Sequence, residues 1–221
     1  MADGSTVRCA FSPHVERAIQ DFWNDLIKKQ PKLYDGPLLH VENVQVDAGK
    51  KSVSVQTVSD VTYRQLIGLR NSAESVESVR VLSILLVPVT TDGISVLQER
   101  APMGDWGQLL EFPGGFVVPK EVAAASGDLF AVAAQKAAQE FGDMLGRVAG
   151  PISWAGAIDC RAIHEYMLVY KVRLSVDFAS YKARRPFAHA ASEESISRSG
   201  IPLHGPSGNV MGMLGVDEVG Q

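Results

Sequence analysis

The sequence predicts an α/β or α+β fold with a core of ordinary size. Over 221 residues, hydrophobic residues make up 46% and charged residues 21%, which is the balance of a globular protein. From residue 80 onward, apolar strand patterns alternate with a long helical pattern, as in sheets covered by helices. Before residue 75 the pattern is a helix followed by a β-hairpin. We therefore divide the chain into an N-terminal module, residues 1–75, and a main domain, residues 76–221.

Charge, hydropathy and cysteine content exclude several classes of protein. Lys and Arg total 21 and Asp and Glu total 25, so the net charge is −4, and we expect no nucleic-acid partner. The longest apolar run, residues 81–89, is about half the length of a membrane span, so we expect no membrane partner. Cys9 and Cys160 form no close pair, and the N-terminus has no apolar signal segment. We therefore expect a reducing, cytoplasmic location.

The N-terminal module begins with an amphipathic helix. Ser12 followed by Pro13 is typical of a helix start, and apolar residues then recur at helical spacing, which predicts a helix over residues 13–30. We expect this helix to pack on the core rather than bind a partner. After it, we predict strands over residues 38–46 and 52–58 joined by a turn at residues 47–50, a helical turn over residues 63–70, and a polar linker over residues 71–78.

The main domain opens with a near-continuous apolar strand, residues 80–90. A second strand, residues 93–99, follows the turn Thr91-Asp92-Gly93. The alanine-rich residues 129–144 predict a helix. The rest of the pattern predicts a loop over residues 101–111, strands over residues 151–160 and 165–176, a basic loop over residues 182–186, and an irregular Gly- and Pro-containing tail from residue 200.

The segment most informative about chemistry lies between the second strand and the end of this helix. Its loop contains Pro113-Gly114-Gly115, and Glu121 follows Gly115 after five intervening residues. The helix carries Glu140, which lies two residues before Gly142.

This segment resembles the Nudix box, whose family pattern is Gly-x5-Glu-x7-Arg-Glu-U-x-Glu-Glu-x-Gly-U, where U is aliphatic. Gly115 and Glu121 match the first half without gaps, whereas the spacer from Glu121 to Gln135 is 13 residues instead of seven. In the second half, Gln135 takes the position of the Arg and Lys136 that of the first Glu. Gln139 and Glu140 take the Glu pair, Gly142 takes the Gly, and Asp143 takes the last aliphatic position.

The resemblance implies a Nudix-like α/β/α sandwich with a mixed sheet, preceded by the N-terminal helix and hairpin. It also implies hydrolysis of the pyrophosphate of a nucleoside diphosphate linked to another moiety. Divalent cations, Mg²⁺ or Mn²⁺, neutralise such a diphosphate and help to orient the attacking water, and they require oxygen ligands. The chain also resembles the UDP-glucose pyrophosphatase-like subgroup in Tyr34-Asp35-Gly36, Tyr63-Arg64 and Glu194-Ser195, which implies a nucleotide sugar as substrate.

The resemblance assigns roles to individual residues. Glu140, Glu121 and the backbone of Gly115 are the candidate metal ligands, and Glu194, beside Glu193, is a candidate for a further ligand or the general base. Each has an alternative role, because Glu121 could instead hold the loop through backbone N–H groups, and the two late acids could be a solvated pair. The candidate substrate-binding residues are Arg100, Lys136, Gly114 and Gly115. A further basic group either steers an anionic substrate or forms a solvated loop, and it consists of Lys182, Arg184 and Arg185.

Two substitutions in the box favour a second class of function. The Lys136 ammonium group cannot ligate Mg²⁺, and Gln139 offers only a neutral oxygen. The alternative is therefore a catalytically impaired Nudix-fold protein that binds a nucleotide ligand or a protein partner. A repurposed fold with other lytic or isomerising chemistry is a third reading. The sequence leaves open whether the N-terminal module forms a homodimer, binds substrate or only completes the core.

Overall fold

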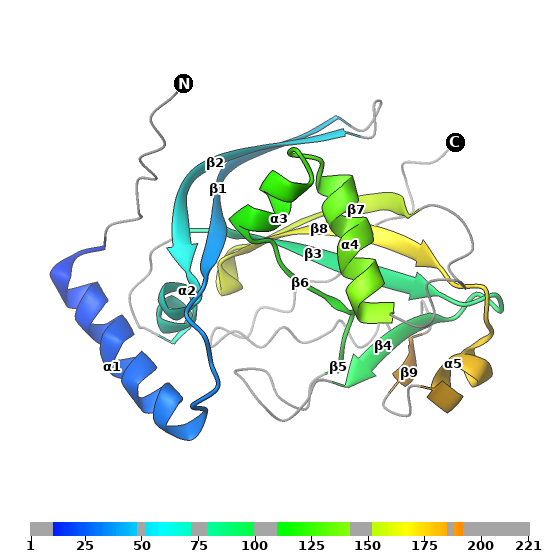
Figure 1. The fold of residues 1–221 in the computed structure, drawn as a ribbon, viewed down its shortest axis with the longest axis horizontal. Helices are drawn as coiled ribbons and strands as arrows, with labels where there is room; N and C mark the ends of the chain where they lie inside the picture. The colour runs from blue at the N-terminus through cyan, green and yellow to red at the C-terminus, as the bar shows by residue number, and fades with distance from the viewer. Residues whose placement is uncertain are drawn as a thin grey trace. The chain divides into compact units, whose positions relative to one another are not determined.

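The computed structural model describes residues 11–47, 52–71, 79–99, 110–141, 152–184 and 188–191. The chain forms two compact units, and Figure 1 shows their elements coloured in chain order. The predicted boundary near residue 75 stays a prediction. The first unit comprises Met1–Ser83, Phe116–Leu129 and Asp159–Met167, and the second comprises Ile84–Gly115, Phe130–Ile158 and Leu168–Gln221.

Helix α1 (Pro13–Lys29) confirms the first predicted helix to within one residue. The Ser12 hydroxyl accepts a long hydrogen bond, 3.4 Å, from the Val15 amide, and proline occupies the first helical turn, where no amide partner is required. The helix buries Val15, Ile19 and Trp23, which recur every four residues on one face. Because of this spacing, a largely polar helix has one apolar face that packs into the core.

Strands β1 (Pro37–Asp47) and β2 (Ser52–Thr62) form the predicted antiparallel hairpin, and both are longer than predicted. Helix α2 (Tyr63–Arg70) begins directly after β2 and confirms the predicted helical turn. Its start is a capping box. The Thr62 hydroxyl accepts from the Gln65 amide at 3.3 Å, and the Gln65 side chain accepts from the Thr62 amide at 3.0 Å. The capping box thus converts a strand into a helix without a loop.

The two helices and the hairpin share one core in the first unit. Gly68 of α2 lies so close to α1 that an added Cβ would come within 2.9 Å of the backbone of Ile19. The close approach confirms the predicted core-packing role of α1. The buried cluster consists of Val15, Ile19, Leu38, Val61, Leu66, Leu69, Val79 and Val81.

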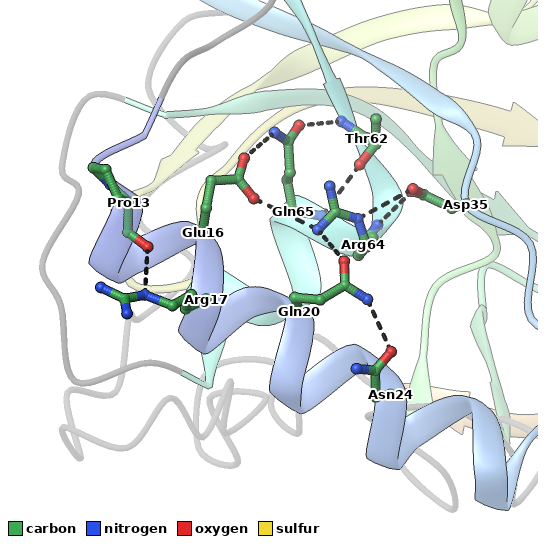
Figure 2. A network of polar contacts seen from close by, with 9 residues as sticks. All are labelled: Pro13, Glu16, Arg17, Gln20, Asn24, Asp35, Thr62, Arg64 and Gln65. Atoms are coloured by element: carbon green, nitrogen blue, oxygen red, sulfur yellow. Dashed lines mark hydrogen bonds and ion pairs between the residues drawn. The ribbon is translucent and has the colours of Figure 1, made fainter.

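Polar side chains tie α1 to α2 at the surface of this core, as Figure 2 shows. Gln65 donates to the Glu16 carboxylate at 3.1 Å, and Arg64 donates to the Gln20 side chain at 3.1 Å. The Arg64 amide also donates to Asp35 at 2.8 Å. Each of these bonds joins segments far apart in the chain, so together they fix where the helix pair lies against the turn before β1.

The hairpin and the remaining strands belong to one mixed sheet, which confirms the predicted α/β fold class. Strand β3 (Val81–Val89) pairs antiparallel with β1 and with β4 (Ser95–Glu99). It also pairs with β6 (Gly114–Phe116) and β8 (Glu165–Arg173). The Val81 amide donates to the His164 carbonyl and the Leu174 amide to the Val89 carbonyl, so β3 and β8 advance in the same direction and are parallel. The other pairings join β7 (Ser153–Cys160) to β8, and β5 (Leu110–Glu111) and β9 (Ala188–Ala191) to β4.

Helix α4 (Leu129–Phe141) confirms the long predicted helix, whose last predicted residues, 142–144, lie outside the described residues. A short helix that was not predicted, α3 (Pro119–Ala124), precedes it. In the part of the chain that the structure describes, no helix is both long and apolar enough to cross a membrane.

Two predicted loops are wrong where the structure describes them. Residues 110–111 form β5, because Glu111 pairs with Gln98 of β4. The basic residues Lys182 and Arg184 lie in helix α5 (Phe178–Arg184). Its start is held by the Asp177 carboxylate, which accepts from the Ser180 amide at 2.7 Å. In both cases a tertiary or capping contact outweighs a local pattern typical of loops.

Candidate functional site

Gly114 and Gly115, which were predicted in a loop, begin strand β6 and lie in the second unit, directly against β3. Gly114 has φ +154°, and a Cβ added there would lie 2.0 Å from the carbonyl oxygen of Ile84. The neighbouring Pro113 carbonyl accepts from the Leu86 amide at 2.8 Å, so the start of β6 is held to β3. At exposed Gly115 an added Cβ would meet nothing within 4 Å. Gly114 is therefore required by packing, whereas Gly115 leaves an open backbone surface.

Glu121 lies in the first unit, in the first turn of α3. Its Oε2 accepts a hydrogen bond from the Val118 amide at 3.0 Å, so the carboxylate satisfies a backbone donor at the start of the helix. The residue is half-buried. This contact is the loop-holding role that the sequence left as an alternative to metal binding.

The four polar box positions on α4 differ in their exposure to solvent. Gln135 and Gln139 are exposed, Glu140 is half-buried, and Lys136 is buried with only 7% of its surface exposed. The other buried residues of the same helix are Val132, Ala133, Ala137 and Phe141. A buried lysine is rare in a folded protein. The position that the box assigns to a glutamate therefore carries a buried lysine here.

The described donors do not by themselves fit a metal cluster. Among the residues that the structure describes, no three His, Cys, Asp or Glu side chains gather closely enough to hold a metal ion. Glu121 belongs to the first unit, and Glu140 and Lys136 belong to the second. The candidates Arg100, Glu193 and Glu194, together with Gly142 of the box, lie outside the described residues.

A buried polar cluster in the first unit was missed by the sequence reasoning. Arg70 donates to the Glu165 carboxylate and, at 2.9 Å, to the Ile163 carbonyl, and the Ser83 hydroxyl donates to the other oxygen of Glu165 at 2.7 Å. The side chains of Arg70 and Glu165 are 5% and 12% exposed. The partners come from α2, β3 and β8, so no local pattern links them. The one available signal was a glutamate at the start of an apolar strand.

Burial shifts the pKa values of titratable groups near this cluster. Burial lowers the pKa of His164, and the positive charge of Arg70 lowers it further, although the contact of Nδ1 with the Val79 carbonyl at 3.1 Å acts in the opposite direction. Burial also raises the pKa of the Cys160 thiol and of the Tyr166 hydroxyl. All three side chains are thereby held in their neutral forms.

Two motifs quoted for the subgroup resemblance contact each other. The Tyr63 amide donates to the Gly36 carbonyl at 2.9 Å, and the Arg64 amide donates to Asp35 at 2.8 Å. The Arg64 side chain also forms ion pairs with Asp35 and Glu16. In the first unit, these motifs therefore connect the turn before β1 to the start of α2.

No family model and no curated protein matches the chain. Solved structures similar to it include a Deinococcus radiodurans protein, with 18% identity over 63% of this chain and 73% of that chain and a TM-score of 0.36. An ADP compounds hydrolase has 16% identity over 64% of this chain and 69% of that chain, with a TM-score of 0.30. RenU, a Nudix hydrolase of M. smegmatis, has 14% identity over 56% of this chain and 74% of that chain, with a TM-score of 0.29.

Proposed function

We propose that the chain is a Nudix-type hydrolase that cleaves the pyrophosphate of a nucleoside diphosphate linked to another moiety, with a sugar as the preferred moiety. The observation that carries the proposal is the first half of the box, Gly115 to Glu121. Gly115, which begins the box pattern, leaves an open backbone surface, and Glu121, at the family spacing from Gly115, holds the start of α3. A glycine without neighbouring atoms at this position presents open backbone to a ligand.

The proposal includes Mg²⁺ or Mn²⁺ as cofactor. When bound, the cation neutralises the diphosphate and helps to orient water. Glu140 on α4 is the proposed ligand, with Glu121 and the Gly115 carbonyl as further candidates. Because the described donors form no cluster of three, the proposal requires oxygen ligands from the remaining residues, for which Glu194 is the candidate. Arg100 is the proposed contact to a substrate phosphate, as a cation at a strand end.

The proposed partner is a small nucleotide diphosphate derivative, and neither nucleic acid nor a membrane is part of the proposal. A cytoplasmic location is supported by the presence of just two cysteines, and a homodimer is the proposed assembly if the protein oligomerises.

The proposal is tested with a panel of nucleotide sugars and other nucleoside diphosphate derivatives, assayed for monophosphate release with Mg²⁺, Mn²⁺ or EDTA. Glu140→Gln should lower kcat/KM by about 100-fold or more if this carboxylate holds the catalytic cation. Gln139→Ala is the matched control, because Gln139 is the exposed neighbour on the same helix and should have little effect. Metal-dependent turnover that is unchanged in Glu140→Gln would refute the assigned role.

A second candidate function is favoured by one observation, the burial of Lys136 at a position that the box gives to an acid. In this alternative the chain binds a nucleotide ligand or a protein partner without turning over a diphosphate. It predicts a nucleotide-dependent rise in Tm that EDTA does not abolish, and no product with any member of the panel. Mg²⁺-stimulated release of a nucleoside monophosphate would eliminate it.

A further inference from the structure

The segment that follows Gly115 begins with an aromatic contact to the N-terminal helices. Phe116 packs against Tyr63 of α2, with ring centroids 6.1 Å apart, and Tyr63 packs edge-on against Trp23 of α1 at 6.3 Å. The guanidinium carbon of Arg70 lies 5.7 Å from the centroid of the Phe116 ring. Aromatic pairs at these distances and a cation over a ring face are both attractive, so Phe116 is held by two residues of α2.

The cation over Phe116 is itself fixed. Arg70 donates to Glu165 and to the Ile163 carbonyl, and Glu165 is held in turn by the Ser83 hydroxyl. With 5% of its side chain exposed, Arg70 is shielded from water, where a contact between a cation and a ring would be weak. The guanidinium group is therefore a rigid support for the ring rather than a mobile surface contact.

The residues after Phe116 are held by their backbones. The Val117 amide donates to the Leu82 carbonyl at 2.9 Å, and the Val117 carbonyl accepts from the Leu39 amide at 3.3 Å. The Val118 amide then donates to Glu121. Residues 116–121 thus have contacts through a side chain at Phe116, through both backbone groups at Val117 and through a carboxylate at Glu121.

We propose that Arg70 is a positioning residue for the first half of the box. It acts through Phe116 on the segment that joins Gly115 to Glu121. The N-terminal module would then set the geometry of this segment as well as complete the core. The consequence for turnover rests on the proposed hydrolase function, whereas the placement of the segment does not.

The placement is tested by amide hydrogen exchange on the full chain. In Arg70→Met, exchange at the Val117 and Val118 amides should accelerate by about threefold to tenfold relative to the Val41 amide. The reason is that a contact between a cation and a ring, or a hydrogen bond to a charged group, changes such an equilibrium by about tenfold. Val41 is the internal reference, since its amide donates to the Arg80 carbonyl in the same unit. Arg64→Met is the matched control, because it removes another arginine of α2 whose partners are Asp35, Glu16 and Gln20.

Two further variants keep the proposal testable if Arg70→Met does not fold. Phe116→Leu leaves the Arg70–Glu165 pair intact and should cause the same local acceleration. Arg70→Lys, which retains a charge near the ring, should restore part of the protection. If all variants, Arg64→Met included, accelerate the three amides equally, Arg70 is merely structural and the proposal is wrong.

A kinetic measurement separates this proposal from the proposed function. Arg70→Met should lower kcat/KM more than Arg64→Met at a temperature where both are fully folded, and Arg70→Lys should recover part of the loss. Equal kcat/KM in Arg70→Met and wild type would overturn the positioning role in catalysis. If the wild type has no turnover, the hydrolase proposal fails, and the exchange ratios still decide whether Arg70 positions the segment.

Discussion

The Val118 amide donates a hydrogen bond of 3.0 Å to Oε2 of Glu121, three residues further along the chain. This bond satisfies a donor that the start of α3 would otherwise leave open. The acid that matches the first glutamate of the box therefore has a structural contact of its own. Glu121 would bind a metal in addition to making this hydrogen bond. Substitutions can therefore separate metal binding from the structural role.

Replacement of Glu121 should reveal the structural role. Glu121→Ala removes the acceptor for Val118 and should destabilise the protein by about 1 kcal/mol, the usual value of a helix-start contact. Glu121→Gln keeps an acceptor and should retain most of that stability. Urea unfolding of the two variants measures the difference. Equal losses of stability in both would show that the carboxylate charge, and not the hydrogen bond, matters.

The two glycines at the start of β6 should respond differently to substitution. Gly114→Ala places a methyl group 2.0 Å from the Ile84 carbonyl oxygen at φ +154°, so the free energy of unfolding should fall by about 2–4 kcal/mol. Gly115→Ala meets no neighbouring atom and should change stability little. Thermal unfolding of both variants checks the contrast. A loss in Gly115→Ala as large as that in Gly114→Ala would contradict it.

The ion pair between Arg70 and Glu165 should be energetically important because it is buried. Glu165→Gln leaves the arginine charge without its ionic partner and should cost about 3–5 kcal/mol. The pair of Lys28 and Asp25 is the surface control, with side chains 74% and 71% exposed, and Asp25→Asn should have no measurable effect on unfolding. Chemical denaturation compares the variants, and a Glu165→Gln protein as stable as Asp25→Asn would refute the assignment.

His164 should make stability depend on pH. Burial, aided by the charge of Arg70, lowers the pKa of His164 in the folded protein below the 6.5 of an unperturbed histidine. Protonation therefore favours the unfolded chain, and the stability present above pH 6.5 is lost as the pH falls through the folded pKa.

The matched variant is His164→Asn. His164 has φ +56°, a left-handed conformation that asparagine tolerates. Urea unfolding at pH 7.5 and pH 5 should show a smaller loss of stability on acidification in this variant than in the wild type. An equal or larger loss in the variant would mean that His164 does not titrate as described.

The sequence predicted elements that depend on local patterns. Ser12-Pro13 and the apolar spacing after it located α1 to within one residue, and β-branched runs located the hairpin. Two elements were predicted as loops for different reasons. Residues 110–111 became a strand because β4 lies beside them, and this pairing with another strand leaves no local pattern. Lys182 joined a helix because Asp177, three residues before Ser180, caps its start, which is a local signal that the prediction overlooked.

Single contacts of the candidate residues were predictable, whereas their roles in a site stay predictions. The backbone-holding alternative for Glu121 matches its contact with the Val118 amide, and the conformation of Gly114 accounts for the need for glycine. The burial of Lys136 and the cluster of Arg70, Ser83 and Glu165 were not foreseen. Helical periodicity indicates which residues share a face of α4. In a helix rich in small residues, it does not indicate which face is buried, because that depends on what packs against the helix.

The central claim, hydrolysis of a diphosphate linkage, is tested most directly by ³¹P NMR of a nucleotide sugar incubated with the protein and Mg²⁺ in ¹⁸O-labelled water. We predict that the diphosphate resonances are replaced by two monophosphate resonances, one of which carries the isotope shift of a newly bound ¹⁸O. The conversion should stop with EDTA and in Glu140→Gln. Persistence of the diphosphate resonances across the substrate panel, under conditions in which the folded protein binds nucleotide, would contradict the claim.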